Sequence, residues 1–123
     1  MVHIFHHNDA DGWLSAAIVY GYYLDLKETT GNMEEIIFHE VDYSMDLVPK
    51  LLEIPNETTI YFVDYSFTKE FLLRVVDLIK VKHFKVTWID HHKTSAELYV
   101  NTPATELAYF DNIVIDEAHS LHQ

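Results

Sequence analysis

The chain has 123 residues and a mass of 14.4 kDa, enough for one domain with a sizeable core and too few for two ordinary ones. Hydrophobic residues make up 49%, charged residues 23%, and there are only three Gly and three Pro, which excludes disordered, collagenous and linker-rich classes. Eight Lys and Arg against 20 Asp and Glu give a formal net charge of −12, which opposes unassisted binding to long duplex nucleic acid.

The first part of the chain alternates between strand and helix character. Residues 2–5 form a short β-branched run that predicts a buried strand. Residues 13–26 are apolar almost all round a helix, so we expect this helix to be buried between the sheet and its neighbours. Residues 27–35 are polar and contain Gly31 and Asn32, which predicts a long surface loop.

The middle of the chain continues this alternation. Residues 36–41 predict a second strand, and Ser44 is placed to cap a short helix over residues 45–52. Residues 59–63 are continuously apolar and rich in β-formers. Such a run is typical of a strand in a parallel sheet that is covered on both faces.

The last part is predicted to hold a helix over residues 68–81, a strand over residues 84–89 and a short strand over residues 113–115. A capping-box pattern begins at Thr94, and Thr102 fits an N-cap before a proline at the first helical position. Strands that alternate with helices predict an α/β domain, with a mostly parallel sheet of about five strands flanked by helices.

In parallel α/β sheets ligands lie beyond the carboxyl ends of the strands, so the residues that follow each strand are the candidates for a site. A four-residue segment is repeated at two such ends. Val41-Asp42-Tyr43-Ser44 recurs as Val63-Asp64-Tyr65-Ser66. The repeat presents two candidate aspartates on the same edge of the sheet.

The first strand is followed by a polar motif in which His7, Asp9 and Asp11 occupy alternate positions. If this segment is extended, the period of two sends all three side chains to one side. Gly12 allows a turn there that a side chain would hinder. The simpler alternative is that Asp11 only caps the helix that follows.

Two later strand ends add Asp64 and the run Asp90-His91-His92. Each alone is compatible with a helix cap or an incidental histidine pair. Together with the first motif they bring several carboxylates to one edge, where two carboxylates ~4 Å apart would repel by about 4 kcal/mol at an effective dielectric near 20. Bound cations or protons would relieve that repulsion.

The chain has no cysteine, so any metal must be held by His, Asp or Glu. Such ligands suit Mn²⁺, Mg²⁺, Fe²⁺ or Zn²⁺, and the number of carboxylates favours two ions over one tetrahedral zinc. A pair of metal ions is suited to phosphoester hydrolysis. Ions in an acidic cleft also attract phosphate locally, even on an acidic protein.

The sequence resembles the DHH phosphoesterase superfamily. The resemblance rests on His7-Asn8-Asp9-Ala10-Asp11-Gly12 as the first motif, Val63-Asp64 as the second and Asp90-His91-His92 as the third, and it extends over residues 2–95. Members of this family include nanoRNases, RecJ-type exonucleases, cyclic-dinucleotide phosphodiesterases and family II pyrophosphatases, typically with Mn²⁺. The resemblance implies a DHH-type N-terminal domain.

By position, the resemblance implies that His7, Asp9 and Asp64 hold one metal ion. It implies that Asp11, Asp64 and His91 help to hold the second, so that Asp64 bridges the two ions. His6, beside His7, is a rival for the ligand role, but it lacks the alternate spacing to Asp9.

The same resemblance gives Asp90 a place in the catalytic site, as a metal ligand or as the partner of a histidine, and directs His92 to the substrate phosphate. Asp42, in the first copy of the repeat, is a weaker rival to Asp64 because its strand is more polar.

The chain departs from the family pattern near its end. We expect one DHH domain over residues 1–123, without the family's fourth-motif aspartate and C-terminal substrate-binding domain, as in a truncated or naturally short member. Asp111 and Asp116 are the only late candidates for the missing aspartate.

The expected function is a metal-dependent phosphodiesterase that hydrolyses short oligonucleotides or cyclic dinucleotides through a hydroxide activated by two ions, with Mn²⁺ ahead of Mg²⁺. A catalytically impaired metal- or nucleotide-binding module that acts through a partner is the alternative, and an ordinary α/β domain with capped strand ends is the third. No membrane partner is expected, because no apolar run is long enough to span a bilayer. The start lacks the basic residues of a signal peptide, so we expect a cytoplasmic protein, and the oligomeric state stays open.

Overall fold

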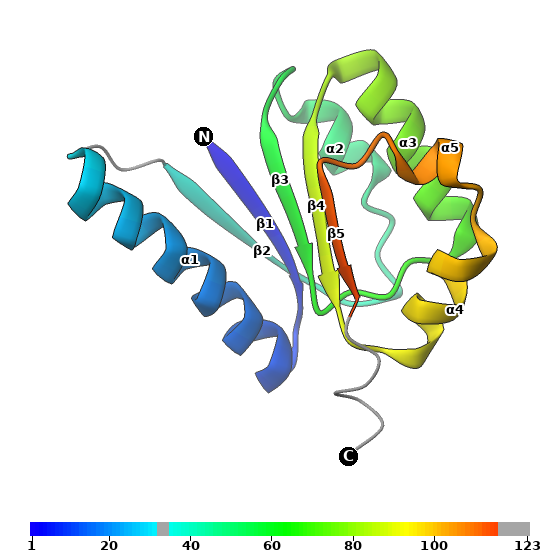
Figure 1. Ribbon diagram of the computed structural model, residues 1–123, viewed down its shortest axis with the longest axis horizontal. Helices are drawn as coiled ribbons and strands as arrows, with labels where there is room; N and C mark the ends of the chain where they lie inside the picture. Colours follow the sequence, from blue (N-terminus) through cyan, green and yellow to red (C-terminus); the bar gives the residue numbers. More distant parts are fainter. Residues whose placement is uncertain (32–34, 116–123) are drawn as a thin grey trace.

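Five parallel strands form one sheet in a computed structural model that describes residues 1–31 and 35–115 (Figure 1). The strand order is β2-β1-β3-β4-β5, and every pair of neighbours is parallel. The strands are β1 (Val2–His7), β2 (Ile36–Val41), β3 (Thr59–Val63), β4 (Lys85–Asp90) and β5 (Asn112–Ile115). The α/β fold predicted from the sequence is therefore confirmed.

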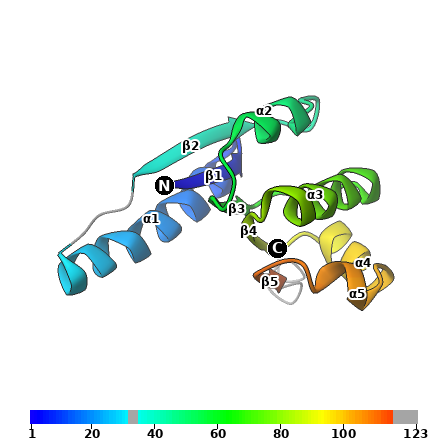
Figure 2. The same ribbon diagram turned by 90° about the horizontal axis from the view of Figure 1, so that it is seen from above.

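The helices are divided unequally between the two faces of the sheet. One face carries α1 (Ala10–Thr30) alone, as Figures 1 and 2 show from two directions. The other face carries α2 (Val48–Glu53), α3 (Lys69–Lys82), α4 (Lys93–Asn101) and the single-turn α5 (Ala104–Leu107). Both faces of the sheet thus carry helices, as is usual for parallel sheets, and α1 packs on β1 and β3.

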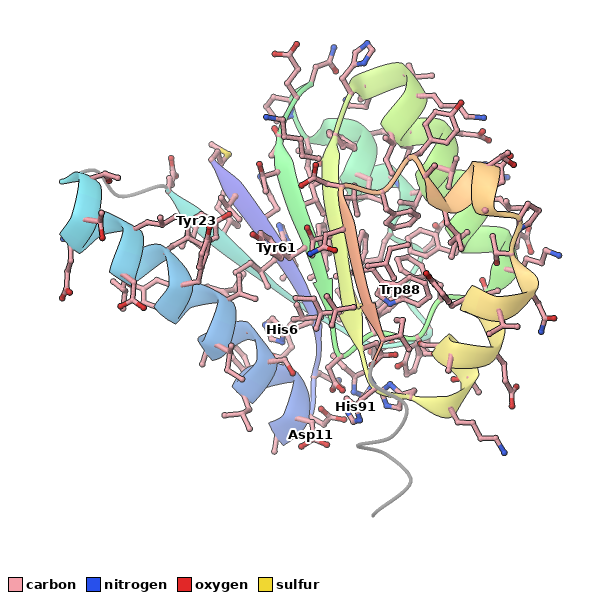
Figure 3. All side chains as sticks on the ribbon, viewed as in Figure 1. His6, Asp11, Tyr23, Tyr61, Trp88 and His91 are labelled. Carbon is pink, nitrogen blue, oxygen red and sulfur yellow. The ribbon has the colours of Figure 1, made fainter. Side chains whose placement is uncertain are left out.

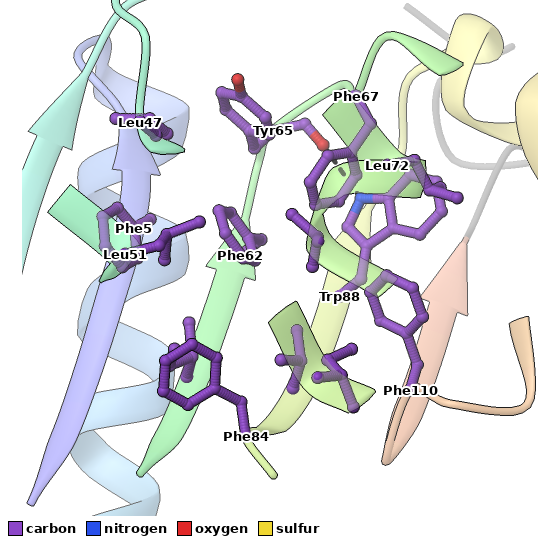
Figure 4. Close-up of a cluster of buried hydrophobic side chains, with 14 of the residues drawn as sticks. Phe5, Leu47, Leu51, Phe62, Tyr65, Phe67, Leu72, Phe84, Trp88 and Phe110 are labelled. Carbon is purple, nitrogen blue, oxygen red and sulfur yellow. Dashed lines mark hydrogen bonds between the residues drawn. The ribbon is translucent and has the colours of Figure 1, made fainter. Parts of the chain in front are cut away.

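The larger of two buried clusters lies between the sheet and α2 and α3, and it is rich in aromatic rings (Figure 4). Trp88 of β4 is fully buried, and its indole Nε1 donates a hydrogen bond of 2.9 Å to the Tyr65 carbonyl. A buried indole needs such a partner, since leaving its N–H unpaired costs about 1–3 kcal/mol. This bond ties β4 to the loop that follows β3.

The smaller cluster lies beneath α1 and contains Ile4, Ala16, Val19 and Val63 among its members. The hydroxyl of Tyr23 lies 3.0 Å from that of Tyr61 across the helix–sheet boundary, and Figure 3 shows these two side chains facing one another.

The expectation that α1 is buried nearly all round is wrong. Its outer face leaves Leu14, Ile18 and Tyr22 exposed by 63%, 68% and 56%, because no described element packs on that side (Figure 2). Although α1 has 21 residues, no helix in the described residues is long and apolar enough to cross a membrane.

Helix α1 also begins and ends differently from the prediction. It begins at Ala10, because the carboxylate of Asp9, not of Asp11, accepts a hydrogen bond of 2.8 Å from the Gly12 N–H. It continues through Thr30 and ends at Gly31, which has φ = 80° and donates its N–H to the Lys27 carbonyl. Residues 27–30, expected in a loop, are therefore helical, while residues 32–34 lie outside the described residues.

Three predicted caps also differ. Helix α2 begins three residues late, after Leu47, and Ser44 instead binds the carboxylate of Asp42. Helix α4 begins after His92, so Thr94 lies within its first turn and no capping box forms there. The proline after Thr102 occupies the N-cap of α5 itself. Helix α3 occupies nearly the predicted residues, and Thr68, expected within the helix, is its N-cap and accepts a hydrogen bond from the Phe71 N–H.

The connections define a switch point between β1 and β3. Strands β1 and β3 are neighbours in the sheet. The chain leaves β1 through α1 on one face and leaves β3 through α3 on the other (Figure 2). The two segments therefore diverge at the carboxyl edge, which is where α/β sheets bind their ligands.

Gly12 is required by close packing rather than by a turn. A Cβ at this position would lie 1.9 Å from the His7 carbonyl oxygen, which is a backbone atom that cannot move aside. Gly21, further along α1, has no atom within 4 Å of its own hypothetical Cβ.

We expect Gly12→Ala to destabilise the fold by about 3 kcal/mol or more, because α1 must move away from β1. Gly21→Ala is the matched control and should raise stability by up to about 1 kcal/mol, as alanine is the better helix former. Urea unfolding followed by circular dichroism measures both changes. Equal stabilities for the two variants would contradict the close approach.

Two histidines pair on the face of the sheet that carries α2. His3 Nδ1 lies 2.7 Å from His39 Nε2, and the ring of His39 also stacks on Phe5. Burial first, and then the charges of His3, Lys50 and His6, lower the pKa of His39 from 6.5 to about 4. The pKa of His3 is also lowered, chiefly by burial.

This pair predicts acid sensitivity. Between pH 6.5 and about 4 the unfolded chain binds a proton at His39 that the folded chain does not, so stability is fully present above pH 6.5 and falls with pH across that window. We expect a loss of about 1–2 kcal/mol at this partly screened position. Urea midpoints of the wild type and His39→Gln, compared at pH 7 and pH 4.5, measure it. The same pH dependence in both proteins would exclude His39 as the cause.

Candidate metal centre

Polar side chains meet at the carboxyl edge of the sheet, from the last residues of strands and from the loops that follow them. These strands are β1, β3 and β4, the three adjacent central strands of the sheet. In Figure 3, Asp11 and His91 mark this end of the molecule. The topology explains the gathering, because the carboxyl ends of adjacent parallel strands meet at the same edge of the sheet.

The first group of metal-ligating atoms joins the loop after β1 to the loop after β3. His7, Asp9 and Asp64 each offer one ligand atom, and these atoms lie within 4.8 Å of one another. His7 Nδ1 lies 2.8 Å from Asp9 Oδ2, while the other oxygen of Asp9 accepts the Gly12 N–H. The carboxylate of Asp9 therefore contacts His7 and begins α1 at the same time.

The second group joins the loops after β3 and β4. Asp64, Asp90, His91 and His92 offer ligand atoms that again lie within 4.8 Å of one another. The rings of His91 and His92 stack with centroids 4.8 Å apart. Asp64 belongs to both groups, which is the position a bridging ligand would occupy.

Asp64 is held in an unusual backbone conformation. Its φ of 51° lies in the left-handed region that non-glycine residues rarely adopt. Its N–H donates a hydrogen bond of 2.9 Å to the Ile89 carbonyl, so the strand β4 fixes the residue at this turn. Such local strain persists only where the surrounding structure over-determines it, and it is characteristic of functional sites.

The carboxylate of Asp64 is only half satisfied by the protein. Its side chain is 1% exposed, and Oδ1 lies 2.8 Å from His91 Nε2. Oδ2 is buried and has no hydrogen-bond partner among the described residues. A buried carboxylate oxygen without a donor is costly unless a cation binds it. Together with the imidazole and carboxylate neighbours, this oxygen fits a hard or borderline divalent ion.

The pKa values of the two nearest carboxyls diverge. Burial raises the pKa of Asp64, and the neighbouring carboxyl of Asp9 raises it further, although His91 opposes the shift. Burial alone would raise the pKa of Asp9 too, but the hydrogen bonds from Gly12 and His7 outweigh it and the net shift is downward. The site therefore favours a proton or a cation between these two carboxyl groups.

Asp90 and His92 form a separate pair. Asp90 Oδ1 lies 2.7 Å from His92 Nδ1, and Oδ2 accepts a short hydrogen bond from the Ser95 hydroxyl. The Asp90 side chain is fully buried, whereas that of His92 is 39% exposed. Of the two roles that the sequence left open for Asp90, these contacts favour that of a partner that orients a histidine.

A chain of hydroxyls connects the loops after β3 and β4. Ser95 Oγ lies 3.2 Å from Ser66 Oγ, which lies 2.7 Å from Thr94 Oγ1. The sequence suggested only a capping role for residues 94–97, because a short motif cannot show that its hydroxyls contact a loop 28 residues earlier.

The structure separates Asp11 from both groups. Asp11 is exposed in the first turn of α1, because the extended conformation ends at Asp9 and the predicted alternation does not reach residue 11. It lies at the same end of the sheet as His91 (Figure 3). Its role as a ligand of a second ion stays a prediction.

The rivals considered from the sequence lie elsewhere. His6 is fully buried and packs against Trp13 of α1, with ring centroids 4.3 Å apart. Asp42 accepts hydrogen bonds from Ser44 and is in neither group. Asp111 precedes β5 and so lies at the amino edge, which excludes it from this site. Asp116 lies outside the described residues.

One residue of the site was missed altogether. Tyr43, in the first copy of the repeat, stacks on His7 with ring centroids 4.8 Å apart. The signal available in the sequence was the repeat itself, which places residues 43 and 65 at equivalent strand ends.

Comparisons with known proteins agree with this geometry. Residues 1–111 match the protein-family model described as the DHH family, N-terminal domain. Searches of the curated proteins and of the solved structures found no match to this chain. The matched region takes in four of the five strands and all three motif segments. The chain therefore belongs to the DHH family, a family of metal-dependent phosphoesterases.

Proposed function

We propose that this protein hydrolyses phosphodiester bonds in short oligonucleotides or cyclic dinucleotides, with two divalent metal ions as cofactors and Mn²⁺ as the favoured ion over Mg²⁺. The observation that carries the proposal is the buried carboxylate of Asp64, which is shared by two groups of imidazole and carboxylate ligands. Membership in a family of metal-dependent phosphoesterases supports the reaction class.

His7, Asp9 and Asp64 would hold one ion. Asp64 and His91 would hold the other, with Asp11 as the further ligand that the family resemblance implies. When bound, two such ions supply an activated water molecule and neutralise charge on the phosphoryl oxygens. The side chains around them have the tasks of keeping the ligands deprotonated and correctly oriented.

The protein's own contribution to the reaction centres on His92. With Nδ1 held by Asp90, Nε2 is the nitrogen left to meet a phosphate at the exposed side of the ring. Asp90 holds the ring in place, so an Nε2–H of His92 can donate a hydrogen bond to a phosphoryl oxygen as charge develops there. His92 is therefore proposed as the catalytic and substrate-binding group, and Asp90 as the residue that orients it.

Charge favours a small substrate. The chain has eight Lys and Arg and a net charge of −12, too few cations for a track that follows a long strand. A short oligonucleotide or cyclic dinucleotide has few phosphates, which the bound ions can neutralise locally. We propose that this reaction takes place in the cytoplasm.

The second candidate is a catalytically impaired module that binds metal or nucleotide and acts through a partner. The observation that favours it is the position of Asp11, which is in neither ligand group. If only one ion binds tightly, the protein would still bind metal or nucleotide, but it would hydrolyse the phosphodiester slowly. Oligomerisation is one way in which a partner could complete the site.

Substitution of the shared carboxylate tests the proposal. Asp64→Asn should weaken Mn²⁺ binding at least tenfold and abolish cleavage of a five-nucleotide RNA. The metal-free variant should be as stable as the wild type or more so, since the raised pKa of Asp64 shows that burial disfavours its ionised form. Titration calorimetry, thermal unfolding and product analysis measure the three effects, and Asp77→Asn, on the exposed side of α3, is the matched control.

The wild type separates the candidates in the same assays. Two bound Mn²⁺ ions with turnover support the phosphodiesterase, whereas binding without turnover supports the module. If the wild type binds no Mn²⁺, or if Asp64→Asn binds it normally, the proposed centre is wrong.

Removal of the proposed phosphate donor should affect turnover more than metal binding. We expect His92→Ala to lower kcat about 10²- to 10³-fold, the effect of losing one donor to a developing charge, with Mn²⁺ affinity within about threefold of the wild type. Asp90→Asn should lower kcat less, because the imidazole remains while its orientation weakens. A loss of Mn²⁺ binding in His92→Ala would instead identify His92 as a ligand.

A further inference from the structure

Tyr43 is an exposed aromatic residue that contacts His7 of the candidate site and the loop that follows Asp64. It follows β2 at the carboxyl edge and is 52% exposed, so it adds little to the core. Its ring nevertheless stacks on His7, with centroids 4.8 Å apart and an interplanar angle of 26°. The stack on His7, and not the exposure of the ring, is what sets Tyr43 apart from other exposed aromatic residues such as Tyr22.

The tyrosine is anchored to the loop after β3 as well. Its hydroxyl accepts a hydrogen bond of 3.2 Å from the backbone N–H of Ser66, two residues after Asp64. Its ring centroid lies 5.3 Å from that of the buried Tyr65. Tyr43 thus links His7 to the loop that carries Asp64, and both of these residues are proposed ligands of the same ion.

The electrostatic surroundings place the hydroxyl close to the site carboxylates. Burial first, and then the charges of Asp90, Asp64 and Asp9, raise the pKa of Tyr43.

His7 needs such a support. Asp9 Oδ2 contacts Nδ1 of the imidazole, and one hydrogen bond fixes one ring atom without fixing the plane of the ring. The stacked phenol restricts rotation about that contact. Orientation of a ligating histidine by its outer neighbours commonly changes metal affinity 10- to 100-fold.

We propose that Tyr43 is a positioning residue that holds the His7 imidazole in its metal-ligating orientation and ties it to the loop that carries Asp64. This inference rests on the metal centre of the proposed function. It also gives the repeated segment a role, because the second copy supplies the ligand Asp64 while the first supplies the ring that orients His7. Asp42, the counterpart of Asp64, binds Ser44 instead.

The test compares Tyr43→Leu, which removes the ring, with Tyr43→Phe, which keeps the ring and removes the hydroxyl. We expect Tyr43→Leu to weaken Mn²⁺ binding about tenfold and Tyr43→Phe to stay within about threefold of the wild type, both measured by titration calorimetry. Tyr22→Leu is the control, since Tyr22 has a similar exposure on the outer face of α1. Thermal unfolding of all three should resemble the wild type.

A second measurement does not depend on metal binding. In the metal-free protein, the carbon-bound ring protons of His7 should carry a ring-current shift in the NMR spectrum that Tyr43→Leu removes and Tyr43→Phe retains. Loss of that shift in Tyr43→Leu supports the stack even if the wild type binds no Mn²⁺, in which case the proposed function fails and the contact stands.

Three results would overturn the inference. The first is Mn²⁺ affinity in Tyr43→Leu equal to that of the wild type. The second is an equal loss in Tyr43→Phe and Tyr43→Leu, which would assign the effect to the hydroxyl. The third is a raised KM in Tyr43→Leu with unchanged Mn²⁺ affinity, which would make the ring a substrate contact. If Tyr43→Leu fails to fold, Tyr43→Met, which also removes the ring, replaces it in the comparison with Tyr43→Phe, and the same Mn²⁺ and NMR outcomes decide.

Discussion

The structure depends on a carboxylate that the protein buries without fully satisfying it. Asp64 is almost inaccessible, has a left-handed backbone and leaves Oδ2 without a hydrogen-bond partner among the described residues. Each of these features is unfavourable for the isolated chain. They persist because β3 is paired on both sides and because the Asp64 N–H is held by β4. The paired strands thus hold a carboxylate whose Oδ2 can take a further partner, such as a proton or a cation.

The sequence predicted the fold well because its strongest signals are those that a parallel sheet imposes. Residues 59–63 could be assigned from their unbroken apolar run, and β3 occupies the same residues. The positions after β1, β3 and β4 followed from the rule that ligands lie at the carboxyl edge. His7, Asp9, Asp64, Asp90, His91 and His92 are indeed brought into two overlapping groups.

The wrongly predicted caps share a physical cause. A short polar side chain can bind the start of a helix or a nearby loop, and these two partners compete for it. Asp9 caps α1, so the extended segment ends before Asp11 and the predicted alternation stops there. Ser44 and Thr94 match cap patterns, yet their hydroxyls bind Asp42 and Ser66 instead. A hydroxyl or carboxylate near a helix start can bind the backbone or another loop, and only the tertiary structure decides between them. The exposed outer face of α1 was not predicted, because the apolar residues of a helix do not show whether another element packs on each of its sides.

The carboxylate of Asp9 has two oxygens and two partners, and this restricts how the protein can evolve. One oxygen starts α1 at Gly12 and the other contacts His7. In the proposed centre Asp9 is also a metal ligand, so a replacement of this residue would affect both the proposed site and the start of α1. Replacement of the proposed ligand His91, which caps no described helix, should disturb folding less than replacement of Asp9.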